Sequence, residues 1–148
     1  SGKDLQELKA KDEVITKVNK LFIYTDSRDW KNVQKLFDKK VAFDMTSLAG
    51  GTPAELTPEQ ITSSWESGLK NLKVIHHQAG NYIVTISSAG ADVFCYGTAV
   101  HYLPDKSGRN TRIFVGSYNI HLVKKESWVI DRFRYNSKFV EGNLDLGK

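Results

Sequence analysis

Apolar residues in the first half of the chain recur at the spacing of an α-helix. Over residues 5–24 they return every three or four positions, which is typical of an amphipathic helix. The segment 29–37 repeats this spacing and predicts a short second helix. A third helix is expected from TPEQ, where Thr57 is a suitable N-cap, Pro58 fits the first helical position and Gln60 completes a capping box.

The remaining segments alternate in period two and predict strands. The segment 41–48 is the first, and the others lie at about 74–86, 91–102, 112–124 and 127–136. The pair Gly80-Asn81 indicates a bulge or bend inside the first long strand. Helices followed by hairpin-connected strands predict an α+β fold, with three N-terminal helices packed on a curved, mainly antiparallel sheet. We expect residues 1–148 to form a single domain.

Both faces of the predicted sheet carry apolar residues. In the segment 93–100 such residues occupy odd and even positions alike, and alternate side chains on a strand point to opposite faces. One layer of helices covers only one of those faces. We therefore expect the outer face to pack against a second copy of the chain, in a dimer or trimer.

Composition excludes several classes of protein. No apolar run approaches the length of a membrane span, so we expect no membrane partner. The formal net charge is +4, but the lysines are dispersed, and we expect no nucleic-acid partner. The charged N-terminal segment has no signal-peptide core, which favours a cytoplasmic location. The lone Cys95 excludes an internal disulfide and is expected to be a small buried hydrophobe.

The adjacent histidines His76 and His77 are the first candidates for chemistry. On a strand they point to opposite faces, which argues against a metal site built from all four histidines of the chain. We expect neither a metal nor a cofactor. His77 or His101 would become a general base only beside a carboxylate that orients its imidazole. The candidate carboxylates are Asp26, Asp29, Asp44 and Asp131.

A polar stripe interrupts the strand FVGSYNIHL. Ser117, Asn119 and His121 share one face, while Tyr118 and its apolar neighbours take the other. Such a stripe lines either a pocket or a solvated face, because a buried polar group without a partner costs about 1 to 3 kcal/mol. Both interpretations stay open on pattern alone. No nucleophile-elbow motif surrounds any serine.

The segment YTDSRDW, at the end of the first predicted helix, resembles the SnoaL-like branch of the NTF2-like superfamily, which has a cone-shaped α+β fold. The similarity extends over nearly the whole chain, with scytalone dehydratase as the closer likeness and hexachlorocyclohexane dehydrochlorinase as the looser one. It implies that Asp26 and His77 are the catalytic pair. It also implies that His101, Ser117 and Asn119 contact the substrate.

Two positions depart from the dehydratase pattern. Where that family has tyrosines that polarise the substrate carbonyl, this chain has Thr25 and Met45. Scytalone is therefore not the expected substrate, and carbonyl activation would have to come from another residue. Tyr82, Tyr96 and Asn119 are the candidates. The predicted substrate-binding set is His101, Ser117, Asn119, Tyr96, Met45 and Trp65.

Three functions follow as hypotheses. The leading one is a lyase in which His77 abstracts a proton, with Asp26 fixing its tautomer, from a small apolar or aromatic substrate. The second is a ketone isomerase or polyketide cyclase, for which Asp44 or Asp131 would supply a carboxylate base. The third is a binding module without catalysis, since one fold supports many functions.

Overall fold

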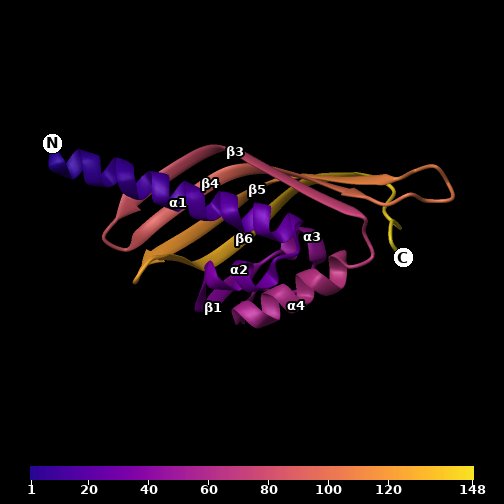
Figure 1. Cartoon of the computed structure of the whole chain (residues 1–148), viewed down its shortest axis with the longest axis horizontal. Coiled ribbons are helices and arrows are strands. Elements are labelled where there is room, and N and C mark those ends of the chain that lie inside the picture. The colour runs from indigo at the N-terminus through magenta and orange to yellow at the C-terminus, as the bar shows by residue number, and fades with distance from the viewer.

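The structure is a computed structural model that describes residues 1–148 as one six-stranded sheet with helices on one face (Figure 1). The strands follow the order β2-β1-β6-β5-β4-β3. Only β1 and β6 pair in parallel. The helices are α1 (Gly2–Asp26), α2 (Trp30–Lys35), α3 (Thr46–Ala49) and α4 (Pro58–Leu69). The strands are β1 (Phe37–Asp44), β2 (Ala54–Leu56), β3 (Val74–Ser87), β4 (Gly90–Tyr102), β5 (Thr111–Lys124) and β6 (Trp128–Gly142). The predicted α+β class is confirmed.

Helix α1 crosses the sheet and covers the core with its second half. Val14, Val18 and Leu21 are fully buried, in keeping with the helical spacing of the sequence. The first turns project beyond the strands, as Figure 1 shows, and Leu5 and Leu8 are exposed there. None of the helices, α1 included, combines the length and apolarity that crossing a membrane requires.

Helix α4 begins with the predicted capping box. The Gln60 backbone N–H donates to the Thr57 hydroxyl at 3.2 Å, and the Thr57 N–H donates to the Gln60 side-chain oxygen at 2.9 Å. Pro58 takes the first helical position, where no N–H is needed. Ile61 is fully buried, so this helix packs one face against the core.

The predicted strand over 41–48 is wrong in its second half. Strand β1 ends at Asp44, whose carboxylate accepts hydrogen bonds from the Thr46 N–H (2.9 Å) and hydroxyl (2.7 Å). These local bonds replace ladder bonds and start the single turn of α3. At its other end β1 begins at Phe37, which the helical spacing had assigned to the second helix. The short β2 strand was not predicted.

The long strands separate an inner face, covered by helices, from an outer face. Val93 and Cys95 of β4 point inward and are buried, and burial raises the pKa of the Cys95 thiol to about 12. The predicted bulge is confirmed as a register shift between Gly80 and Ile83. On the outer face Tyr96 is 45% exposed. Packing of this face against a second copy stays a prediction.

Two glycines on the inner face leave room for aromatic rings from the neighbouring strands. A Cβ on Gly97 would lie 2.3 Å from a ring carbon of Tyr118. A Cβ on Gly116 would lie 2.6 Å from the Tyr135 hydroxyl oxygen. Each tyrosine therefore occupies the space above a glycine on the neighbouring strand, and the two rings pack with centroids 5.0 Å apart.

Replacing Gly97 with alanine should destabilise the fold, because the new methyl group overlaps the Tyr118 ring. Overpacking of this kind costs about 1 to 3 kcal/mol in the free energy of unfolding. Urea denaturation followed by circular dichroism measures it. Gly80→Ala is the matched control, since no atom lies within 4 Å of the added Cβ. Equal stability of the two variants would contradict this packing.

Candidate active site

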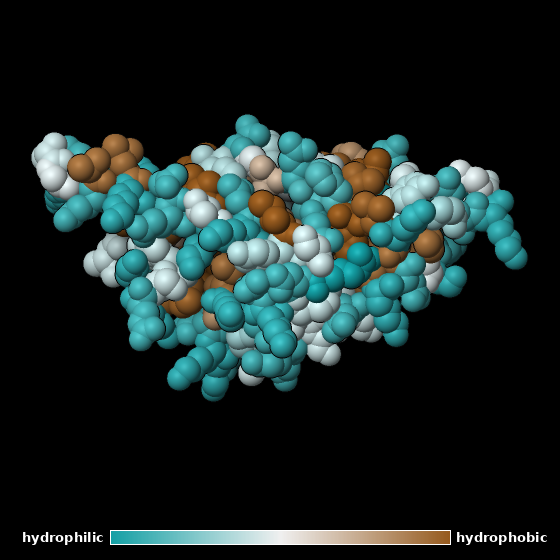
Figure 2. Space-filling view, in the orientation of Figure 1, coloured by the Kyte–Doolittle hydropathy of each residue, from teal (hydrophilic) through white to brown (hydrophobic).

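A cavity of about 200 Å³ lies between the helices and the inner face of the sheet. Ten of its sixteen lining residues are hydrophobic, and α1, α3, α4 and strands β3 to β6 all contribute side chains. On the face seen in Figure 2, apolar side chains gather beyond the end of α1 and beside α4. His77 and His101 are the imidazole groups that line the cavity.

His77 is held by Asp26 through two hydrogen bonds. Its ring Nδ1 lies 2.6 Å from Asp26 Oδ1, and its backbone N–H donates to Asp26 Oδ2 at 2.8 Å. Since a carboxylate only accepts, the Nδ1 proton faces Asp26 and Nε2 keeps a free lone pair. The His77 side chain is 16% exposed, and the Phe22 ring stacks on it at 5.6 Å. The predicted His–Asp pair is therefore present and faces the cavity.

The chain directly after Asp26 fixes the end of α1 in place. Arg28 adopts a left-handed backbone conformation with φ 54°. Its guanidinium donates to the backbone carbonyl of Leu69, the last residue of α4, at 3.3 Å, and to that of Leu72, just beyond the helix, at 2.6 Å. The Leu69 carbonyl has no partner within the helix, so Arg28 helps to cap α4 and also anchors the loop that follows Asp26.

His101 lies in the same cavity but has a different partner. The Arg112 guanidinium is 3.1 Å from His101 Nδ1, and the Phe114 ring packs against the imidazole at 4.8 Å. The His101 residue is 8% exposed. Burial, with a smaller contribution from the Arg112 charge, lowers the pKa of His101 to about 4. His101 is therefore neutral at pH 7.

Met45 and Trp65, two of the predicted substrate-binding residues, line the cavity. Met45 is the N-cap of α3, so the early end of β1 turns this segment toward the cavity. Sequence reasoning missed Tyr118, Tyr135 and Arg112. The two tyrosines line the cavity from the inner face of β5 and β6. Their signal was the strand alternation itself, which sets Tyr118 opposite the polar stripe.

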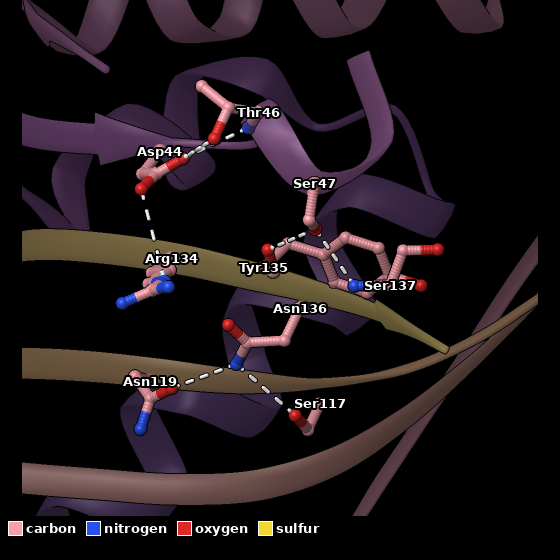
Figure 3. A network of polar contacts seen from close by, with 9 residues as sticks. All are labelled: Asp44, Thr46, Ser47, Ser117, Asn119, Arg134, Tyr135, Asn136 and Ser137. Atoms are coloured by element: carbon pink, nitrogen blue, oxygen red, sulfur yellow. Dashed lines mark hydrogen bonds and ion pairs between the residues drawn. The ribbon is translucent and has the colours of Figure 1, made fainter. Parts of the chain in front are cut away.

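Ser117, Asn119 and Tyr96, which were predicted to contact the substrate, do not line the cavity. Tyr96 pairs directly with Ser117 across β4 and β5, on the face opposite to Tyr118 and the cavity. Figure 3 shows Ser117 and Asn119 turned toward Asn136 of β6, whose amide donates to both, at 3.2 Å and 2.8 Å. The stripe is thus a hydrogen-bonded part of the outer face.

The other candidate carboxylates are engaged outside the cavity. Asp29 caps α2, and Asp44 accepts from Thr46. Asp131 lies 2.6 Å from His121 Nδ1 in a second His–Asp pair, and His121 lines a separate, more polar hollow of about 300 Å³ on the outer face. Carbonyl activation by Tyr82 has no support either, because its hydroxyl donates to Asn19 and does not line the cavity. No three His, Cys, Asp or Glu side chains converge as metal ligands.

Lowering the pH should reduce stability through His101. Its folded-state pKa of about 4 lies below the ordinary value of 6.5, so its contribution is complete above pH 6.5 and is lost as pH falls toward 4. Linkage gives a loss of about 2 kcal/mol between pH 7 and pH 5. Urea denaturation of wild type and His101→Gln at both pH values measures the difference. His76→Gln, which removes an exposed imidazole, is the control, and the loss of stability between the two pH values should be smaller in His101→Gln than in this control.

Solved structures with this fold cover nearly the whole chain. The Kfla4162 protein from Kribbella flavida has a TM-score of 0.86 and 18% identity, and the match covers 91% of this chain and 95% of that one. A candidate scytalone dehydratase from Novosphingobium aromaticivorans has a TM-score of 0.74 and 17% identity, covering 95% and 89%. A hexachlorocyclohexane dehydrochlorinase, LinA-type3 from Novosphingobium barchaimii, has a TM-score of 0.78 and 10% identity, covering 97% and 96%.

None of the curated proteins matches the chain in sequence. The fold is NTF2-like, as the sequence resemblance implied. Residues 6–134 match the SnoaL-like domain, which is most of the chain. The chain therefore belongs to the SnoaL-like domain family.

Proposed function

We propose that this protein is a small-molecule lyase in which His77 is the general base. The observation that carries the proposal is the His77–Asp26 pair, 2.6 Å between Nδ1 and Oδ1, facing a mostly apolar cavity. Asp26 holds the Nδ1 proton, so the basic Nε2 lone pair is free for a substrate proton. Asp26 also stabilises the imidazolium that forms when His77 accepts that proton.

The elimination needs no group beyond this pair and the substrate. The substrate C–H bond breaks and its proton moves to His77 Nε2, while the electron pair forms the new double bond and expels the leaving group. When the leaving group is hydroxide, the proton on His77 passes to it and water departs, which returns the imidazole to its starting form. The apolar walls strengthen each electrostatic contact by excluding water.

The walls of the cavity favour a small, flat substrate. The rings of Phe22, Trp65, Phe114 and Phe133 contribute to them, and the volume is about 200 Å³. A small apolar or aromatic organic compound is therefore the proposed substrate class. The names of two proteins with the same fold, a dehydratase and a dehydrochlorinase, denote eliminations of this kind and support the reaction type.

The isomerase or cyclase hypothesis required Asp44 or Asp131 as a carboxylate base, and both have other partners. Asp44 accepts from Thr46 and lies 3.9 Å from the Arg134 guanidinium, and Asp131 is paired with His121. Neither carboxylate lines the cavity. A binding module without catalysis remains the alternative that experiment has to separate from the lyase.

Removing either member of the pair should strongly reduce turnover while ligand binding persists. Against a panel of small β-hydroxy and β-chloro carbonyl compounds, His77→Ala and Asp26→Asn should lower kcat/KM by about 10²- to 10⁴-fold, the usual contribution of a general base. Isothermal titration calorimetry reports whether the substrate still binds. Circular dichroism checks that the fold is kept.

His121→Ala and Asp131→Asn are matched controls for this experiment, since they break a pair with the same 2.6 Å contact outside the cavity. They should leave kcat/KM within a factor of about two, which is the spread expected for a site remote from the chemistry. Full turnover by His77→Ala would exclude the proposed base. Binding without turnover by the wild-type protein would instead favour the binding module.

A further inference from the structure

The two imidazoles of the cavity have Nδ1 partners of opposite character. His77 Nδ1 meets the Asp26 carboxylate, which only accepts hydrogen bonds. His101 Nδ1 meets the Arg112 guanidinium at 3.1 Å, and a guanidinium only donates. The Nδ1 atom of His101 must therefore carry a lone pair, which places the proton of the neutral ring on Nε2. At Nε2, His77 is thus a hydrogen-bond acceptor and His101 is a hydrogen-bond donor.

The surroundings of His101 also oppose a second proton on its ring. The groups that act on its charge are Arg112 on β5 and His77 on β3, which disfavour the imidazolium, and Asp26 on α1, which favours it. Burial disfavours the charged form most strongly, and the combined effect lowers the pKa of His101 to about 4. A single distant carboxylate, already bonded to His77, does not reverse this balance.

The register of the sheet places Arg112 beside His101. It lies directly opposite His101 in the β4–β5 pairing, so the two side chains are cross-strand neighbours. A second guanidinium nitrogen lies 3.4 Å from the backbone carbonyl of Leu144, and the guanidinium carbon lies 5.4 Å from the centroid of the Phe114 ring. Its Nε is buried without a hydrogen-bond partner. The side chain is therefore held in place while directing one N–H at His101.

We propose that Arg112 is a positioning residue that fixes His101 as a neutral hydrogen-bond donor, with its proton on Nε2, in the cavity that His77 also lines. The ligand group that meets His101 is then an uncharged hydrogen-bond acceptor, such as a carbonyl oxygen. During turnover this donor would stabilise negative charge that develops on that oxygen as His77 removes the proton. That last role rests on the proposed function, whereas the tautomer of His101 does not.

Nitrogen-15 NMR of the histidine side chains tests the tautomer without any substrate. In the wild-type protein, His101 should show a protonated Nε2 and an unprotonated Nδ1, and should stay in this form from pH 8 down to about pH 5. Arg112→Met removes the donor and the charge, and should raise the titration midpoint of His101 by at least about one pH unit. Arg112→Lys keeps the charge, and its His101 titration midpoint should lie between those of the wild type and Arg112→Met.

Arg109→Met is the matched control. Arg109 also binds a backbone carbonyl of the C-terminal segment, donating to Gly142 at 2.8 Å, but it does not contact His101. Its replacement should leave the His101 signals unchanged. A wild-type His101 with its proton on Nδ1 would overturn the proposal. So would an unchanged midpoint in Arg112→Met. Neither result depends on turnover, so the lyase proposal can fail while this one stands.

A pair of probes tests the ligand chemistry directly. Calorimetry would compare 1-indanone with indane, which have similar size and differ by the carbonyl oxygen. Wild-type protein should bind the ketone about three- to tenfold more tightly, the effect of one net hydrogen bond. His101→Phe keeps a ring but removes the donor, and should bind both probes equally. Equal binding by the wild type would overturn the inference that this part of the cavity takes an acceptor.

Discussion

The site depends on the double hydrogen bond between Asp26 and His77. One carboxylate oxygen accepts from the ring and the other from the backbone N–H of the same residue, so α1 and β3 are joined at a single point. A carboxylate at the C-terminal end of a helix is electrostatically unfavourable, because the helix dipole is negative there. The two bonds offset that cost. They also fix the imidazole relative to the helix that closes the cavity.

Much of the fold could be predicted because its signals are local. The capping box at Thr57, the bulge after Gly80 and the alternation of the long strands each depend on residues close together in sequence. The end of β1 at Asp44 was missed for a related reason. The alternating pattern continues to Leu48, but the bonds from Asp44 to Thr46 outweigh it.

The candidate site was predicted in part. The pairing of Asp26 with His77 was inferred from a resemblance, and the structure places the two in contact. The same resemblance assigned Ser117 and Asn119 to the cavity, although the period-two pattern left their face open. The alternation separates these residues from Tyr118, but only the three-dimensional structure shows which of the two faces borders the cavity.

The two His–Asp pairs in this chain have the same 2.6 Å separation, and only one of them borders the cavity. A geometric template that searches structures for an imidazole and a carboxylate at hydrogen-bond distance would return both. Proton NMR would likewise show two strongly hydrogen-bonded imidazole N–H groups, and a downfield signal would need residue-specific assignment before it was attributed to the site. In this fold, the surroundings of a His–Asp pair carry more functional information than its internal geometry.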